Sequence, residues 1–138
     1  MADAVTSQTI LDTPSKLVMK FTNTSDGTGE SAVKKVDVSA FTAGQGGPHS
    51  DTSAATCTGV TIDKIWFNNS GMTAKLLWDA SSDVEAIHLK DGDGYYDFSD
   101  FGGLRNNASS PTGDIMLTTV SHSSGDFYWV VLEMTKLS

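Results

Sequence analysis

Short stretches in which apolar and polar residues alternate constrain the fold of this chain more than any other feature. Apolar residues recur at every second position from Leu17 to Phe21 and from Met72 to Trp78. Successive side chains of a strand point to opposite sides, so this spacing indicates strands with one buried face. No window of about twelve residues carries the 3.6-residue period of an amphipathic helix. The pattern therefore predicts an all-β protein.

Turn-forming residues divide the chain into a series of such stretches. We expect strands at 17–22, 35–40, 59–67, 72–79, 84–89, 95–98, 115–120 and 127–134. Residues 68–71 (Asn-Asn-Ser-Gly) form a hairpin-type turn, so the strands at 59–67 and 72–79 are expected to pair with each other. A change of apolar phase near Lys64 indicates a β-bulge. These features predict a single β-sandwich of about eight short antiparallel strands, with a jelly-roll or an immunoglobulin-like topology.

The length of 138 residues fits one domain. Residues 1–9 are small and polar and are expected to form a flexible N-terminal arm, followed by a single sandwich domain over 10–138. The arm lacks the basic and apolar segments of a signal peptide, so synthesis in a cytoplasm without secretion is expected. The irregular segment 42–55 is expected to be a functional or mobile loop. The segment 99–113 is also loop-like, with one helical turn expected near 101–104.

Charge excludes two classes of partner. The chain has 17 acidic residues against 9 Lys and Arg, a formal net charge of −8. A nucleic-acid-binding protein needs a basic surface, and anionic membranes attract basic segments. No apolar run reaches the length of a membrane span. We therefore expect neither nucleic acid nor membrane as a partner.

The residue types that carry catalysis or bind metals are scattered. His49, His88 and His122 lack the spacing of zinc ligands, and Cys57 has no evident base beside it. Three acidic residues lie close together in the sequence, as a catalytic acid–base pair can: Asp79, Asp83 and Glu85. In a chain with 17 acidic residues, such proximity is expected by chance. We expect no enzyme activity, no cofactor and no metal ligand.

The most suggestive polar cluster is Asp91-Gly92-Asp93-Gly94, with Asp97 and Asp100 nearby. Asp-Gly supplies the backbone angles of a tight hairpin turn. Calcium also favours several oxygen ligands on one flexible loop, but the EF-hand spacing is incomplete here. A turn alone is the preferred interpretation, and a turn that holds a weak cation stays open.

The tryptophans allow two interpretations. Trp66, Trp78 and Trp129 are able to form a sugar-stacking platform, but each lies in an apolar alternation, which favours placement in the core. The final strand, 127–134, is apolar on both faces, so it is expected either between two packed layers or against another subunit. Trp129 is the tryptophan expected to reach an interface.

Five stretches, which together cover most of the chain beyond residue 15, carry a resemblance to a known family in their overall composition and in their order along the chain. They are KLVMKFTNTSD (Lys16 to Asp26), GTGESAVKKVDVSA, CTGVTIDKIWFNNSGMTAKLLWDA, YYDFSDFGGLRNNA and GDIMLTTVSHSSGDFYWVVLEMTK. In this they resemble a family of small virion structural proteins of tailed bacteriophages. The resemblance implies a non-enzymatic capsid decoration (cement) protein. Such a protein is β-rich, binds the outer capsid surface and is synthesised in the host cytoplasm.

The resemblance also implies the partners: the major capsid protein and further copies of the chain, as a dimer or trimer. The expected mechanism is the cross-linking of neighbouring capsid subunits by the arm and the two loops. The residues expected at such interfaces are Ala2, Val5, Ile10, Phe127, Trp129 and Val131. Two alternatives stay open: a neck, tail or fibre component of the virion, and a β-sandwich module that binds host glycans.

Overall fold

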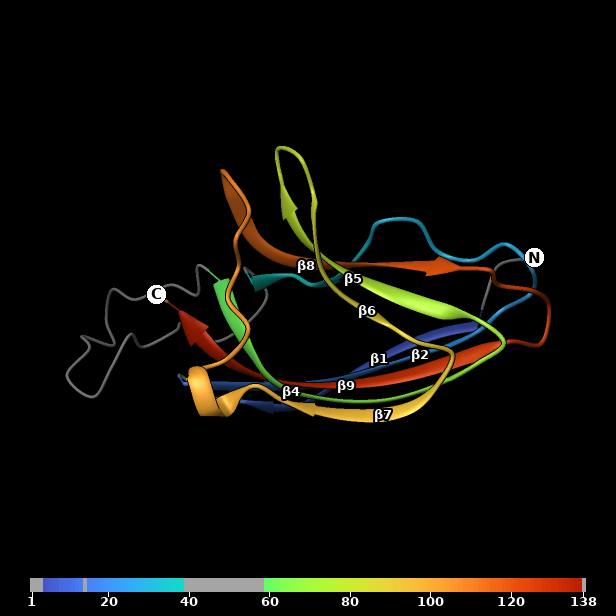
Figure 1. Ribbon diagram of the computed structural model, residues 1–138, viewed down its shortest axis with the longest axis horizontal. Coiled ribbons are helices and arrows are strands. Elements are labelled where there is room, and N and C mark those ends of the chain that lie inside the picture. The colour runs from blue at the N-terminus through green and yellow to red at the C-terminus, as the bar shows by residue number, and fades with distance from the viewer. Residues whose placement is uncertain (1–3, 14, 39–58, 138) are drawn as a thin grey trace.

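The chain forms two antiparallel β-sheets packed face to face (Figure 1). The structure is a computed structural model that describes residues 4–13, 15–38 and 59–137. The five-stranded sheet has the order β1 (Ala4–Asp12), β2 (Lys16–Thr24), β9 (Phe127–Leu137), β4 (Gly59–Ser70) and β7 (Gly92–Asp97). The four-stranded sheet has the order β3 (Val33–Val36), β8 (Pro111–Val120), β5 (Thr73–Ala80) and β6 (Val84–Leu89). The expected all-β sandwich is confirmed.

The strand order selects one of the two expected topologies. Strands β2 to β9 form four antiparallel pairs, β2–β9, β3–β8, β4–β7 and β5–β6, so that each pair encloses the next along the chain. The pairs alternate between the sheets, as in a two-stranded ribbon rolled into a sandwich. This arrangement is a jelly roll, to which β1 adds a ninth strand at one edge.

The hairpin expected between 59–67 and 72–79 is wrong. These residues form strands, β4 and β5, but β4 pairs with β9 and β7 whereas β5 pairs with β8 and β6. The connection at residues 71–72 passes from one sheet to the other. Each strand has one apolar face, and the two faces meet across the core instead of lying side by side in one sheet.

A second expected hairpin, at Asp91-Gly92-Asp93-Gly94, is wrong for the same reason. The strand before it, β6, lies in the four-stranded sheet, and the strand after it, β7, lies in the five-stranded sheet. The Asp91 carboxylate accepts a hydrogen bond from the Gly71 backbone N–H at 3.1 Å. The two connections between the sheets are thus joined to each other at this end of the sandwich.

The bulge expected near Lys64 is confirmed. The pairing of β4 with β9 shifts between Ile62 and Lys64. One extra residue in β4 lets Ile62 and Ile65, which have opposite parity, both point into the core, where each is fully buried. Beyond the bulge, the residues of β4 that face solvent are in the phase of Trp66 and Asn68.

The expected division into an arm and a domain differs from the structure. Ala4–Asp12 is one continuous strand, paired along its length with β2, so residues 4–9 belong to the sandwich. Its residues from Ala4 to Leu11 are exposed on both faces, which explains their polar, arm-like composition. The loop expected at 42–55, together with Ala2, His49 and Cys57, lies outside the described residues.

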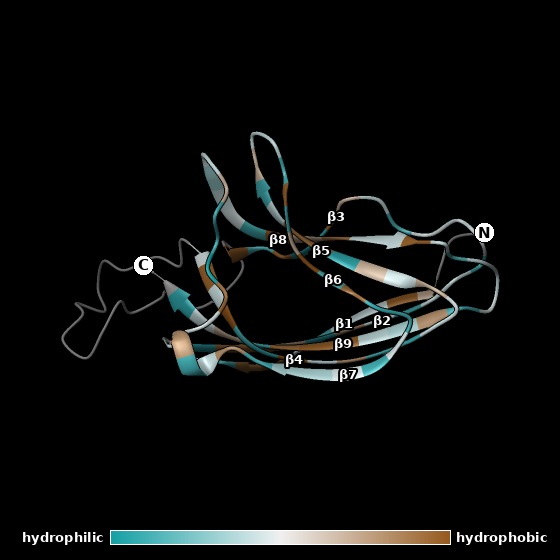
Figure 2. Ribbon diagram, in the orientation of Figure 1, coloured by the Kyte–Doolittle hydropathy of each residue, from teal (hydrophilic) through white to brown (hydrophobic). Residues whose placement is uncertain are grey.

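The core fills the space between the inner faces of the two sheets. Its largest fully buried side chains include Trp78, Tyr128, Phe21 and Phe67. Figure 2 shows hydrophobic residues along the strands and mostly hydrophilic residues in the turns at either end. Gly94 is the cross-strand partner of Phe67, and the Phe67 ring covers it so closely that a Cβ atom there would lie 2.7 Å from the ring.

The loop between β2 and β3 is fixed by a buried charge. Glu30 Oε2 lies 2.5 Å from Lys35 Nζ, and Oε1 accepts hydrogen bonds from Asn23 Nδ2 and Tyr128 Oη, both at 2.6 Å. The Glu30 N–H donates to Thr119 Oγ1 at 2.8 Å. Hydrogen bonds and an ion pair among buried polar groups therefore attach the loop to one side of the core.

At the other end of the sandwich, the chain after β7 makes a short 3₁₀-helix, η2 (Ser99–Phe101), close to the helical turn expected near 101–104. Residues 102–110 then cross from the five-stranded to the four-stranded sheet (Figure 1). Leu104 forms an isolated antiparallel bridge with Ile62 on the way. The described residues contain no helix that is long and apolar enough to cross a bilayer.

Candidate functional site

The outer face of the five-stranded sheet carries three large aromatic side chains. Trp66 of β4 lies opposite Tyr95 of β7 on one side and Val131 of β9 on the other. Two residues before Val131 in β9, Trp129 lies opposite Asn68. Trp66 and Trp129 are therefore diagonal neighbours, at a spacing of roughly 7–8 Å between backbones. The three rings form a band across three adjacent strands, which we call the aromatic face (Trp66, Tyr95 and Trp129).

Two of these rings, Trp66 and Tyr95, stack on each other and form what we call the ledge. The Trp66 and Tyr95 ring centroids are 5.3 Å apart and their planes differ by 28°. Tyr95 is 49% exposed and Trp129 is 37% exposed, so both present ring surface to solvent. Clustered exposed aromatics at one face of a soluble protein are typical of a contact surface.

The tryptophans divide between the two interpretations of the sequence. Trp78 is 1% exposed and lies in the core, as expected. Trp129 is 37% exposed, and the interface expected there stays a prediction. Core placement was wrong for Trp66, because the bulge in β4 moves it into the solvent-facing phase. The final strand β9 is the central strand of its sheet. Its inner face packs on the core, and its outer face carries Trp129 of the aromatic face.

Polar and charged groups surround the rings. Register places Lys20 beside Val131 and Thr22 beside Trp129 in β2, and Asp93 beside Asn68 in β7. Further along the same face, Lys64 Nζ lies 3.9 Å from a Glu133 carboxylate oxygen. The aromatic face thus offers hydrogen-bond donors and acceptors on each side of its rings.

Asp97, at the end of β7, is held in its charged form. Its Oδ1 accepts hydrogen bonds from Ser99 Oγ at 2.5 Å and from the Ser99 N–H at 2.9 Å. These hydrogen bonds from Ser99, with a smaller contribution from the Lys64 charge, hold the pKa of Asp97 below the usual range of an aspartate. Asp97 therefore supplies a charged hydrogen-bond acceptor beside the rings at neutral pH.

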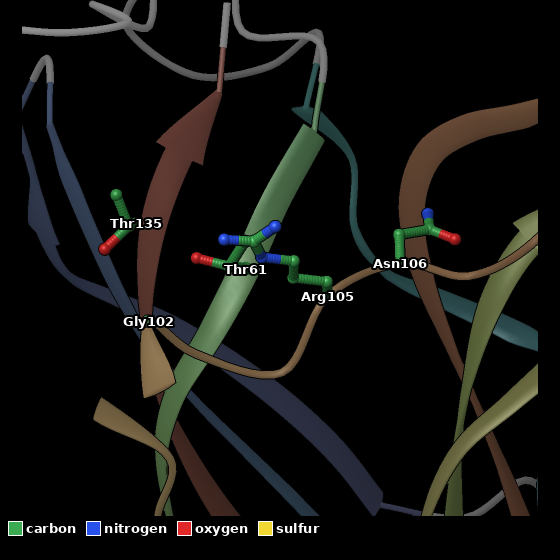
Figure 3. A pocket seen from close by; sticks show the side chains of 5 residues that line it. All are labelled: Thr61, Gly102, Arg105, Asn106 and Thr135. Carbon is green, nitrogen blue, oxygen red and sulfur yellow. The ribbon is translucent and has the colours of Figure 1, made fainter. Parts of the chain in front are cut away.

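A pocket of about 400 Å³ lies at one end of the same sheet face (Figure 3). Thr61 and Thr135 form its floor, because they are cross-strand partners in the outward phase of β4 and β9. Gly102, Arg105 and Asn106 of the segment after η2 form its wall. In Figure 3 the Arg105 side chain extends over Thr61.

The floor of the pocket rests on a small polar network. Asp63 Oδ2 lies 2.7 Å from Lys16 Nζ and accepts a hydrogen bond from Thr135 Oγ1 at 2.6 Å. Asp63 is the extra residue of the β4 bulge, and it is 6% exposed. The hydrogen bond to Asp63 orients the Thr135 hydroxyl in the floor of the pocket.

The residues expected at an interface fall into two groups. Phe127, Trp129 and Val131 share the outward phase of β9, and Phe127 and Trp129 are each 37% exposed. Val5 and Ile10 lie on β1, at 42% and 51% exposure. Strand β2 separates the groups, and Ala2 lies outside the described residues.

The scattered polar candidates each contact a different part of the fold. His88 Nε2 lies 2.8 Å from Thr73 Oγ1, and His122 Nδ1 lies 3.2 Å from Thr119 Oγ1. Asp79 accepts from Thr112, Asp83 accepts from the Ala80 N–H, and Glu85 pairs with Lys75. Within 4–13, 15–38 and 59–137, no three His, Cys, Asp or Glu residues are grouped as a metal site.

Sequence reasoning missed the pocket. Arg105, the only arginine of the chain, and Asn106 follow a loop-like stretch with no periodicity to place them. Thr61 lies in a strand that was expected, but its outward phase depends on the bulge. The antiparallel bridge between Ile62 and Leu104 brings these segments together in the folded chain.

Comparison with known proteins gives structural likeness of limited extent. No family model matches the chain, and no curated protein matches it. A solved structure of a family 29 carbohydrate-binding module aligns over 96% of this chain and 88% of its own, at 9% identity and a TM-score of 0.41. A CBM29-2 variant complexed with cellulohexaose aligns over 96% of this chain and 91% of its own, also at 9% identity and a TM-score of 0.41.

Proposed function

We propose that this chain is a non-catalytic binding module and that its aromatic face binds an extended carbohydrate. The observation that carries the proposal is the placement of Trp66, Tyr95 and Trp129 on the solvent side of one sheet, in register with polar side chains. Each ring lies on a strand, so the backbone fixes the spacing of the platform before any ligand arrives.

The chemistry of the face matches that of a sugar chain. A pyranose ring presents C–H groups on its faces and hydroxyls around its edge. The C–H face packs against an aromatic ring through dispersion and the hydrophobic effect. The hydroxyls need partners when water is removed. Polar side chains of β2, β4 and β7 lie near the rings and can supply them: Lys20, Asn68, Asp93 and Asp97.

The length of the surface favours an oligosaccharide. Trp129 and Thr135 are six residues apart on β9, a distance of roughly 20 Å along the strand. The aromatic face and the pocket at Thr61, Arg105 and Asn106 lie on the same side of the sheet. A chain of several sugar units would therefore cross the rings and place one end in the pocket.

The test is binding of the purified protein to a panel of oligosaccharides and cell-surface glycans, followed by titration calorimetry on the strongest ligand. We expect Trp66→Ala, Tyr95→Ala and Trp129→Ala each to weaken binding about tenfold, near 1.4 kcal/mol. His88→Ala, an exposed ring on the opposite sheet, is the matched control and should bind normally. Absence of glycan binding, or binding that the three variants leave unchanged, would overturn the proposal.

A second candidate function is that of a virion structural protein, most simply a decoration protein on the outer capsid surface. The resemblance of the sequence to phage virion proteins favours it, as does the apolar strip of Phe127, Trp129 and Val131 along β9. Apolar and aromatic residues of this kind form the centres of protein interfaces. Here the partner of the aromatic face is the major capsid protein.

Quantitative mass spectrometry of purified virions separates the two candidates. A small-integer ratio to the major capsid protein supports a decoration role, and a few copies per particle support a neck, tail or fibre position. Absence of the chain from virions contradicts both virion roles and leaves glycan binding as the remaining candidate. Trp129→Ala should lower occupancy on capsids only where the aromatic face is the attachment surface.

A further inference from the structure

Strand β1 is an open sheet edge. It pairs with β2 on one side, and on its other side it pairs with no strand of the described residues. The backbone N–H and C=O groups along that side are thus available to another strand. Residues Ala4 to Thr9 pair with β2 in continuous register, before a register shift between Thr9 and Leu11.

The other edge strands carry features that oppose pairing. Strand β7 exposes Asp93 and Asp97, and β3 is only four residues long and carries Lys34. Strand β6 exposes Glu85 and has a register shift in its pairing with β5. Charges, short length and bulges are the usual means by which edges avoid association.

Strand β1 has no such protection over its regular part. From Ala4 to Leu11 it contains no charged residue and no proline. It also exposes apolar side chains, with Val5 at 42%, Ile10 at 51% and Leu11 at 44%. An uncharged, β-branched, exposed edge is the form that pairs readily with another strand.

We propose that β1 pairs antiparallel with β1 of a second copy, which makes a dimer with one continuous ten-stranded sheet. The net charge of −8 opposes self-association, and β1 is the edge where two copies meet without bringing charges together. A two-fold axis through the strand pair makes the contact self-complementary.

The geometry of antiparallel pairing sets the register. A two-fold axis perpendicular to the sheet keeps inner faces together, so odd-numbered residues of β1 pair with odd-numbered residues. Pairing centred on Ser7 places it opposite its own copy, Val5 opposite Thr9, and Thr6 opposite Gln8. No pair contains a charge, and the aromatic faces of the two copies lie on the same side of the joined sheet.

The first measurement is the mass of the full chain in solution across a dilution series, by sedimentation velocity or light scattering without sugar. We expect a shift from the monomer mass of 14.6 kDa to twice that value as concentration rises. The result does not depend on the proposed function, because no ligand is present. A monomer mass at every concentration would overturn the proposal.

Ser7→Lys tests the register, because it places two ammonium groups against each other at the axis. We expect it to lower the dimer affinity at least tenfold. Ser81→Lys, with the same charge change in the exposed turn between β5 and β6, is the matched control and should dimerise normally. Circular dichroism and thermal unfolding check that both variants fold. Association that Ser7→Lys leaves unchanged would contradict pairing through β1.

A disulfide gives an independent test of the same axis. In a Cys57→Ser background, Ser7→Cys should form an intermolecular disulfide on mild oxidation, since paired backbones lie within disulfide range. Val5→Cys is the matched control, because its two copies would lie four residues apart along the strands, roughly 13 Å. Equal cross-linking of both variants would contradict the register.

Discussion

At the scale of single residues, the buried charge of Glu30 depends on the partners that surround it. Glu30 is 8% exposed, and its carboxylate contacts Lys35, Asn23 and Tyr128. A buried ion pair adds little over apolar residues of the same shape, but removal of one partner leaves the other buried without compensation. The loop between β2 and β3 therefore depends on both charges.

We expect Glu30→Ala to lower the free energy of unfolding by about 3–5 kcal/mol, since Lys35 stays buried. Urea unfolding followed by tryptophan fluorescence measures the change. Glu85→Ala is the comparison, because its pair with Lys75 is exposed and such pairs contribute about 0–1 kcal/mol. Equal effects of the two substitutions would contradict a structural role for the buried pair.

The lowered pKa of Asp97 predicts that the stability of the fold depends on pH. Hydrogen bonds from Ser99 lower its pKa in the folded protein relative to the unfolded chain. Its contribution to stability is thus complete above the unfolded pKa and is lost as pH falls through the folded pKa. Asp97→Asn should cause a small decrease in Tm at neutral pH, and the difference from wild type should vanish in acid.

Thermal unfolding from pH 7 to pH 2 measures this difference. Asp93→Asn removes the same charge from the same strand without a contact to Ser99, so it separates the hydrogen bond from net charge. A Tm difference for Asp97→Asn that persists unchanged at the lowest pH would contradict the assignment.

At the scale of elements, β7 depends on a glycine for its packing. Gly94 leaves the space that the Phe67 ring occupies, and a Cβ there would approach the ring to 2.7 Å. We expect Gly94→Ala to destabilise the fold by about 1–3 kcal/mol, because Phe67 must shift in a close-packed core. Asp93→Ala, on the outward side of the same strand, should cost less.

Gly94→Ala should also weaken ligand binding at the aromatic face. Phe67 stacks on Tyr96, and Tyr96 is adjacent in β7 to Tyr95 of the aromatic face. A shift of Phe67 would therefore displace the strand that carries the ledge, and ligand affinity should fall together with stability. Chemical unfolding and glycan titration of Gly94→Ala measure the two effects; a loss of affinity without a loss of stability would contradict the packing explanation.

At the scale of the whole molecule, the jelly roll makes the last strand central. Strand β9 lies between β2 and β4, and Tyr128, Val130 and Leu132 of its inner face are buried. We expect a chain without residues 127–138 to lose cooperative unfolding, because the five-stranded sheet splits at its centre. Removal of residues 1–10 should leave the sandwich folded, since this part of β1 covers none of the core.

Circular dichroism and urea unfolding of the two truncated chains test this difference. The chain without residues 1–10 keeps Asp12, the partner of the buried Lys136, and should also be monomeric if dimers form through β1. In a dimer, two aromatic faces on one side of the joined sheet would bind a multivalent surface with greater avidity than one. Cooperative unfolding of the chain without β9 would contradict the central role of that strand.

The sequence by itself determined the strands. Period-two alternation, turn residues and the phase change at Lys64 act within a few residues of one another, so they predict strand positions, the bulge and the sandwich class. The outward placement of Trp129 follows from the same local pattern. Residues 4–9 were expected to form an arm because an edge strand exposed on both faces has no apolar alternation.

Only the tertiary structure decided which strands pair. The pairing of Lys16 with Thr135, the division of β4 and β5 between two sheets, and the jelly-roll order all join residues far apart in the chain. Local patterns contain no information about such partners, because each apolar face is satisfied by any complementary face. For the same reason, the contact of Glu30 with Lys35 and Tyr128, and the pocket at Thr61 and Arg105, appear only when the sheets pack together.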